Sequence, residues 1–242
     1  MPRIRALVAL ALALSAATAC QSEKASSSAA EPAAEKPGEA QDKEAARALF
    51  VRYRDAIANR KGTEAVGVVS AKTIAYFEAT RVGALKMSAA ELRTQPLMDR
   101  LMILILRGRI PRADLERWTG KDLFAVAVDN GWVGDNVSTV EPAEIRINGD
   151  EALIGVKAGT EALPAGSGFQ AQREAGGWKL DVMSIRDLAE PALEAQLREV
   201  DPDLDRAMMA LLSVLLKKKV DESIYEPLIS APAPAPGNGT TP

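Results

Sequence analysis

Few side chains in this sequence could carry out chemistry, and the first is its only cysteine, Cys20. A lone thiol cannot form an internal disulfide, but it can be modified covalently. The sequence contains no histidine, which excludes Ser-His-Asp and Cys-His catalytic sites and removes the commonest metal ligand. We therefore assign no catalytic residue and expect no metal and no cofactor.

The residues before Cys20 have the three parts of a bacterial export signal. Arg3 and Arg5 form a charged start, and Ala6–Leu14 forms an apolar run too short to span a bilayer. Ala17-Thr18-Ala19 then supplies small side chains for a signal peptidase. This segment resembles a bacterial lipoprotein signal, in which cleavage after Ala19 leaves Cys20 as a lipidated first residue.

An ordinary secretory site also fits Ala17-Thr18-Ala19, and cleavage there would release a soluble protein. Lipidation is favoured because a free thiol is a liability in an oxidising compartment, and because a polar stretch follows Cys20. The resemblance implies a signal peptide over residues 1–19 and several acyl chains that bind a membrane. Gln21, where some lipoproteins have Asp, implies the outer membrane, with the protein facing the periplasm.

Composition divides the rest of the chain into three parts. Residues 20–41 are rich in Ala, Ser, Glu, Lys and Pro, which predicts a disordered tether after the lipidated cysteine. Residues 230–242 predict a disordered tail, and residues 42–229 are long enough for one globular domain. The formal net charge of −3 and the 4% aromatic content argue against nucleic acid as a partner.

The first half of the predicted domain has helical patterns. Apolar residues recur at helical spacing within Asp42–Arg60, and Lys61-Gly62 predicts that this helix ends. Further helices are predicted from Ser70 through Val82, from Pro96 through Ile105 and from Pro111 through Trp118. The capping box of Ser88 and Glu91 predicts the start of another helix, and a last one is predicted from Thr119 to Asn130-Gly131.

The second half changes to a two-residue period. Alternating residues predict strands around Ile145–Ile147, Ala152–Val156, Phe169–Arg173 and Trp178–Val182, with a hairpin turn at Asn148-Gly149. Two helices follow: one over Asp187–Val200, and one capped by Asp201 with Pro202 in its first turn. We expect an α+β fold in which a helical N-terminal half packs on a four-stranded antiparallel meander, with two extra C-terminal helices.

A helical segment followed by a meander that ends in Gly176-Gly177-Trp178-Lys179-Leu180-Asp181 resembles the NTF2-like (cystatin-like α+β cone) superfamily. Many bacterial lipoproteins of unknown function share this ending. The resemblance covers about Asp42–Ile185, and it implies a cone-shaped pocket. Enzymes of that superfamily use Asp, Tyr and often His in the pocket.

Three residues are the candidates for such a pocket: Tyr53, Tyr76 and Asp99. A carboxylate and a phenol can exchange protons with a substrate if burial moves their pKa values toward neutrality. The plainer interpretation is that both tyrosines belong to the core. Asp201–Asp205 is not a calcium loop, because Arg206 and Leu212 occupy the positions that need Gly and Glu.

Two functions of different classes remain. The preferred one is a membrane-anchored, non-catalytic domain that binds an envelope protein, peptidoglycan or an apolar ligand. The alternative is a small-molecule pocket enzyme of the isomerase or hydrolase type, acting through a carboxylate and a tyrosine. A homodimer contact through the helix that carries Met98 and Met102 is a further possibility that the sequence does not rank.

Overall fold

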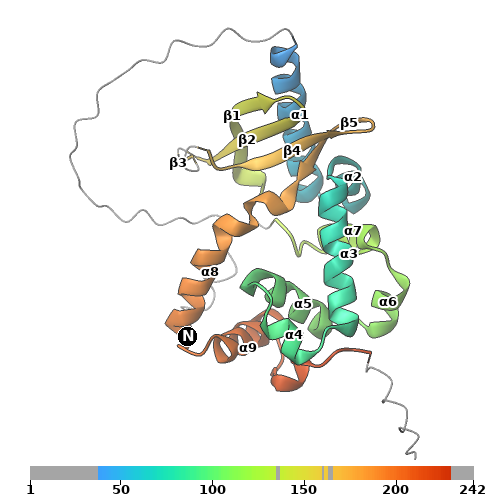
Figure 1. Cartoon of the computed structure of the whole chain (residues 1–242), viewed down its shortest axis with the longest axis vertical. Helices are drawn as coiled ribbons and strands as arrows, with labels where there is room; N and C mark the ends of the chain where they lie inside the picture. The colour runs from blue at the N-terminus through green and yellow to red at the C-terminus, as the bar shows by residue number, and fades with distance from the viewer. Residues whose placement is uncertain (1–37, 135–136, 160, 163–165, 230–242) are drawn as a thin grey trace, which may run out of the picture. The chain divides into compact units, whose positions relative to one another are not determined.

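The computed structural model describes residues 38–134, 137–159, 161–162 and 166–229 (Figure 1). Ala19, Cys20, the signal segment, most of the predicted tether and the predicted tail lie outside the described residues. Contacts divide the chain into two compact units, and the divisions fall after Thr73, Phe124 and Ile185. The single domain of residues 42–229 stays a prediction, since two compact units can fold together or separately.

The first unit, called the sheet unit, comprises the described residues up to Thr73 together with those from Ala125 to Ile185. Its antiparallel sheet has the strand order β1-β2-β4-β5, with the short β3 paired to β2. The strands are β1 (Val140–Asn148), β2 (Glu151–Ala158), β3 (Glu161–Ala162), β4 (Phe169–Glu174) and β5 (Gly177–Asp181). The predicted α+β layout and its four-stranded meander are confirmed.

The predicted hairpin between β1 and β2 is present, and its loop lies one residue later than the predicted Asn148-Gly149. Asn148 pairs with Glu151, so the two loop residues are Gly149 and Asp150. Gly149 has a φ of 63°, a conformation that glycine adopts without the steric cost of a Cβ. The loop therefore fixes the register that sets which side chains face each side of the sheet.

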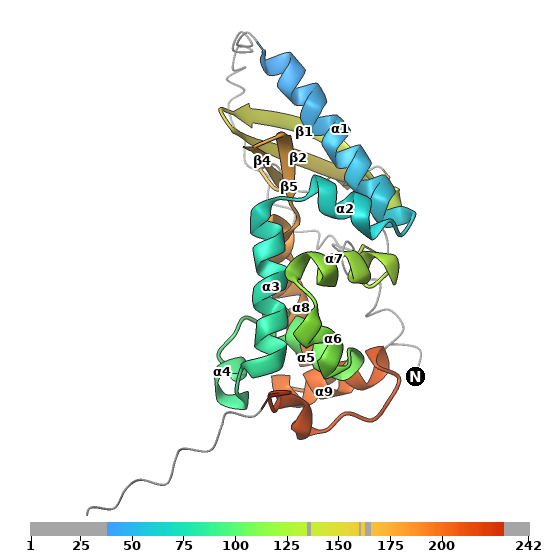
Figure 2. The same cartoon turned by 90° about the vertical axis from the view of Figure 1, so that its right-hand side faces the viewer.

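One face of the sheet is covered by α1 (Glu39–Ala58), as Figure 2 shows. Phe50 is fully buried, and its ring centroid lies 5.4 Å from that of Phe169 on β4. Ile154 and Leu180 are also fully buried on this face. The helix begins at Glu39, so the last residues of the predicted tether, up to Gln41, are helical.

A second helix in this unit, α2 (Gly62–Val68), was not predicted, because Lys61-Gly62 has the pattern of a helix stop. The Gly62 N–H donates to the Asp129 carboxylate across 2.6 Å. A Cβ on Gly62 would lie 2.3 Å from the Ala125 carbonyl oxygen, so only glycine fits. Contacts with residues distant in the sequence therefore stabilise this helix. The three-residue 3-10 helix η2 (Val137–Thr139) leads into β1.

The second unit, called the helical unit, comprises Ile74–Phe124 and the described residues from Arg186. Its core helix α5 contacts α8, α9 and the 3-10 helix η4. The remaining elements of the chain are α3 (Ala71–Lys86), α4 (Ala89–Arg93), α5 (Leu97–Arg109), α6 (Arg112–Arg117), α7 (Gly120–Asp129), η3 (Val182–Ile185), α8 (Arg186–Val200), α9 (Leu204–Leu215) and η4 (Glu222–Tyr225).

Most helix starts follow the predicted pattern. The capping box of Ser88 and Glu91 is present, with both reciprocal hydrogen bonds. Pro96 precedes α5 as its N-cap, with φ and ψ of −49° and 147°, and is not the first helical residue. Asp203 caps α9 in place of Asp201, because its carboxylate accepts the N–H groups of Asp205 and Arg206.

Candidate functional site

The structure brings two of the three predicted pocket residues together. In the helical unit, the Tyr76 hydroxyl donates to Asp99 Oδ1 across 2.9 Å. Arg186 Nη1 donates to the same carboxylate oxygen across 3.1 Å. Tyr53 belongs to the sheet unit, where its ring centroid lies 6.2 Å from that of Phe169. Tyr53 is therefore a core residue, as the plainer interpretation expects.

The surroundings of Tyr76 in the Tyr76–Asp99–Arg186 group favour its protonated form. Burial and the adjacent Asp99 carboxylate raise the pKa of Tyr76 well above its ordinary value of 10.0. The Tyr76 phenol thus keeps its proton at neutral pH. The Asp99 carboxylate forms an ion pair with Arg186. This arrangement joins α3, α5 and α8 inside the helical unit.

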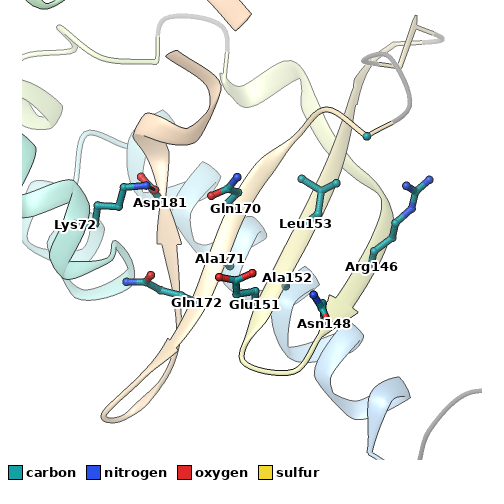
Figure 3. Close-up of a pocket in the computed structure, with 11 residues that line it drawn as sticks. Lys72, Arg146, Asn148, Glu151, Ala152, Leu153, Gln170, Ala171, Gln172 and Asp181 are labelled. Carbon is teal, nitrogen blue, oxygen red and sulfur yellow. Dashed lines mark ion pairs between the residues drawn. The ribbon is translucent and has the colours of Figure 1, made fainter. Parts of the chain in front are cut away.

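A pocket of about 480 Å³ lies on the face of the sheet opposite α1 (Figure 3). The alternation along each strand places polar side chains on this face, because the other side of each strand is buried against α1. Its lining residues come from β1, β2, β4, β5, the start of α3 and the turn before β4. They are Lys72, Arg146, Asn148, Glu151, Ala152, Leu153, Gly166, Gln170, Ala171, Gln172 and Asp181.

Strand register arranges these side chains in two rows across the sheet. One row runs from Arg146 through Leu153 and Gln170 to Asp181, each residue paired with the next. The other runs from Asn148 through Glu151 to Gln172. Neighbouring strands lie about 4.8 Å apart, so the hydrogen-bonding groups of each row follow one another at about that spacing. Leu153 is the one residue that interrupts the first row. The side chains of these two rows are therefore polar except for Leu153.

An ion pair closes one end of this pocket. Lys72 Nζ lies 2.7 Å from Asp181 Oδ2, and the two side chains are 65% and 4% exposed. The other Asp181 oxygen accepts the Met183 N–H across 3.1 Å. The charged residues that line the pocket are equal in number, two cations (Lys72 and Arg146) and two carboxylates (Glu151 and Asp181). Such a surface suits a polar ligand without net charge.

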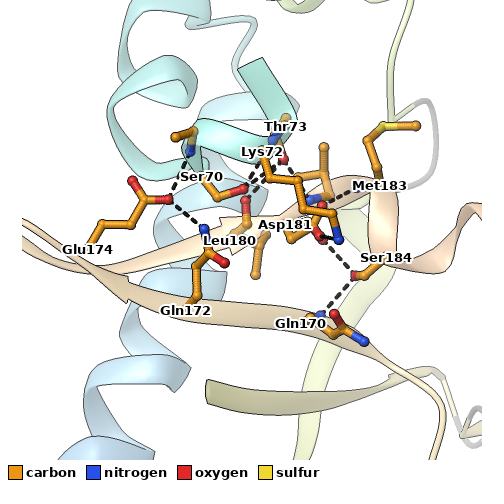
Figure 4. A network of polar contacts seen from close by, with 12 residues as sticks. Ser70, Lys72, Thr73, Gln170, Gln172, Glu174, Leu180, Asp181, Met183 and Ser184 are labelled. Carbon is orange, nitrogen blue, oxygen red and sulfur yellow. Dashed lines mark hydrogen bonds and ion pairs between the residues drawn. The ribbon is translucent and has the colours of Figure 1, made fainter. Parts of the chain in front are cut away.

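A network of polar contacts holds Lys72 in place, because it fixes the start of α3 against β5 (Figure 4). The Ser70 N–H donates to the Leu180 carbonyl across 2.8 Å, and the Thr73 N–H donates to Ser70 Oγ across 3.1 Å. Ser70 therefore caps α3. Thr73 Oγ1 in turn accepts the Val182 N–H across 3.1 Å. Ser70 and Thr73 are fully buried.

A second set of contacts in the same network aligns β4 with the helix. Glu174 Oε1 accepts the Ala71 N–H across 2.9 Å and the Gln172 side-chain amide across 2.7 Å. Ser184 Oγ donates to the Asp181 carbonyl and accepts the Gln170 N–H. The side chains that line the pocket near Asp181 are thus fixed by neighbouring hydrogen bonds.

The charged groups at one end of the pocket are already paired. Asp181 is occupied by Lys72 and a backbone amide, so no free base faces the pocket at this end. Within the described residues, no group of three or more Asp, Glu, Cys or His side chains is placed to hold a metal ion. The pocket therefore offers charge-balanced hydrogen bonding to a ligand.

Comparisons with known proteins find no match: neither a protein-family model, nor a curated protein, nor a solved structure is significantly similar to this chain. The resemblance to the NTF2-like superfamily accordingly stays a prediction. None of the helices in the described ranges has both the length and the apolar character needed to cross a membrane.

Sequence reasoning missed the residues that line this pocket. The polar positions of the predicted strands, among them Gln170 and Gln172, carried a signal: they fall on one side of the sheet and alternate with buried residues. Lys72 and Asp181 gave no such signal, because 109 positions separate them and contacts such as the bridge between Val69 and Leu180 bring them together.

Proposed function

We propose that this protein is a lipoprotein of the bacterial cell envelope, anchored through lipid on Cys20. The observation that carries the proposal is the position of the only cysteine directly after Ala17-Thr18-Ala19 and the apolar run Ala6–Leu14. Cleavage after Ala19 would make Cys20 the first residue. Acyl chains there would anchor the protein to a membrane.

The folded part of this lipoprotein binds a partner and does not catalyse a reaction. Three observations support this: the sequence lacks histidine, the Asp99 carboxylate is held by Arg186, and the pocket on the open sheet face is charge-balanced. The polar lining favours an envelope protein or a polar ligand such as peptidoglycan over an apolar ligand. The NTF2-like likeness belongs to the same proposal and rests on the meander ending in Gly176-Gly177-Trp178.

Fractionation of bacterial cells tests the anchor. The wild-type protein should sediment with outer membranes, and Cys20→Ser should be released into the periplasm because no acyl chain can be attached. Gln21→Asp is the matched variant, since it keeps the cysteine and should move the protein to the inner membrane. Sedimentation of Cys20→Ser with membranes, equal to the wild type, would refute the anchor.

Photo-crosslinking in intact cells tests the binding surface. A photoreactive amino acid at Gln170 places the probe on the open sheet face, and one at Glu116 places it on an exposed part of α6. We expect a discrete crosslinked species from Gln170 and none from Glu116. Crosslinking at background level from both positions would contradict a partner on this face.

The alternative function is a pocket enzyme of the isomerase or hydrolase type, and one observation favours it: Tyr76 and Asp99 are hydrogen-bonded. Tyr76→Phe and Asp99→Asn each remove one reacting group with little change of shape. If the protein binds and does not catalyse, both variants complement a deletion strain in proportion to their stability. Full loss of function in a variant that is as stable as the wild type would favour the enzyme.

A further inference from the structure

A second pocket in the sheet unit has a different electrostatic character. It encloses about 340 Å³ and lies beside α1, α2 and the turn between β4 and β5. Three cationic side chains line it, Arg52, Arg173 and Lys179, against one carboxylate, Asp42. The pocket thus has an excess of positive charge, although the formal net charge of the whole chain is −3. The pocket therefore concentrates positive potential on an acidic protein.

The single carboxylate in this pocket is already occupied. Arg173 Nη2 donates to Asp42 Oδ1 across 2.7 Å, and the Trp178 indole N–H donates to the same oxygen across 3.3 Å. Arg173 also contacts Asp150 across 3.2 Å and lies over the Trp178 ring, 4.6 Å from its centroid. These contacts fix Arg173 and Trp178 as a rigid wall and leave Asp42 little capacity to neutralise the other two cations.

Of the three cations that line this pocket, Arg52 is the one without a partner among the described residues. It is exposed on α1, and no described residue forms a hydrogen bond or ion pair with its guanidinium. Its neighbour Arg54, by contrast, is paired with Asp55 across 3.0 Å. Lys179 Nζ donates one hydrogen bond, to the Gly67 carbonyl across 2.5 Å, and an ammonium group has three donors. Two donors of Lys179 therefore stay available for a ligand.

We propose that this pocket binds an anionic oxygen group, a carboxylate or a phosphate, through Arg52 and Lys179. Guanidinium groups match both anions geometrically, and a charge-assisted hydrogen bond is about twice as strong as a neutral one. The fixed Arg173 adds positive potential without having to release its own partners. The site is separate from the pocket on the open sheet face, and the inference does not depend on lipidation of Cys20.

Nuclear magnetic resonance on the chain from Gln21, titrated separately with inorganic phosphate and with acetate, tests this site. The indole N–H of Trp178 is the reporter, and it is identified among the three tryptophans by Trp178→Phe. We expect a saturable shift of this signal with at least one anion, and the anion that binds more tightly identifies the ligand class. Absence of a saturable shift with both anions would overturn the proposal.

Matched variants separate a site from general electrostatics. Arg52→Gln and Lys179→Gln should each weaken anion binding about tenfold, which corresponds to about 1.4 kcal/mol. Arg54→Gln removes the same charge from the same helix and should change the affinity less than about twofold. Equal weakening by Arg52→Gln and Arg54→Gln would show attraction to net charge alone and would refute the pocket. Unchanged backbone spectra confirm that each variant is folded.

Discussion

Lys72 and Asp181 form an ion pair in which the acid is buried and the base is exposed. Their charged atoms lie 2.7 Å apart, and the side chains are 4% exposed for Asp181 and 65% for Lys72. The exposed lysine contributes little to stability because solvent screens it. The buried carboxylate also accepts the Met183 N–H, so its loss leaves a backbone donor without its partner.

This asymmetry predicts unequal effects of two substitutions. Asp181→Ala should lower the free energy of unfolding by about 2 kcal/mol, because it breaks the hydrogen bond that leads into η3. Lys72→Met should lower it by less than about 1 kcal/mol. Urea denaturation of both variants measures the difference. A larger loss in Lys72→Met than in Asp181→Ala would contradict the roles assigned to this pair.

Two glycines of α2 should respond in opposite directions to alanine. Gly62→Ala places a Cβ 2.3 Å from the Ala125 carbonyl and should destabilise the protein by about 1 to 3 kcal/mol. Gly67→Ala meets no atom within 4 Å and should stabilise the helix by about 0.5 to 1 kcal/mol. Thermal unfolding measures both. If Gly62→Ala is neutral, the close packing of α2 described here is wrong.

Arg107 is a buried cation that binds backbone carbonyl groups. It is 8% exposed and donates to the carbonyls of Ala84 and Gly83 across 3.0 and 3.1 Å, and to those of Met87 and Tyr225. Burial lowers its pKa to about 10. The side chain thus joins the end of α3 to η4 within the helical unit.

Replacement of Arg107 should therefore be costly. Arg107→Met leaves several buried carbonyls without donors, and we expect a loss of about 3 kcal/mol in the free energy of unfolding. Arg112→Met, which breaks only an exposed pair with Glu116, should cost less than about 0.5 kcal/mol. Guanidinium denaturation compares the two variants. Similar small losses would mean that Arg107 is not the link between these elements.

The three tyrosines predict the behaviour of the protein at high pH. Burial raises the pKa values of Tyr53 and Tyr76, and raises that of Tyr225 to about 12, from an ordinary value of 10.0. A raised pKa means that the folded state holds the proton more tightly. The stability contribution is therefore complete below pH 10 and is lost as the pH rises through the folded-state values.

Phenolate absorbance and circular dichroism should consequently change together in an alkaline titration. We expect no separate ionisation step near the ordinary tyrosine value of 10.0 while the protein is folded. A step at that pH with native circular dichroism would show that a tyrosine is exposed. Tyr225→Phe should leave the remaining transition in place, because Tyr53 is buried and the Tyr76 hydroxyl donates to Asp99.

Local signals in the sequence predicted local structure. The box of Ser88 and Glu91 forms because its partners are three residues apart, and the hairpin after β1 forms because Gly149 accepts a positive φ. The C-terminal stop of α7 is likewise present at Gly131, with a φ of 65°. These features depend on neighbours along the chain, so the residues themselves specify them.

Features that depend on distant residues could not be predicted from those patterns. The sequence at the start of α2 has the pattern of a helix end. The helix is held there by a hydrogen bond from Gly62 to Asp129, 67 positions further along the chain. The Tyr76–Asp99 contact was considered, but its third member Arg186 lies 87 positions after Asp99. Arg100 on α5 is 7% exposed and pairs with Asp205, 105 positions further along the chain.

Intact-mass analysis of the protein extracted from membranes tests the proposed anchor most directly. The account predicts a chain that starts at Cys20 and carries the mass of several acyl chains on that residue. An unmodified Cys20 thiol, on protein recovered wholly from the aqueous fraction, would contradict it.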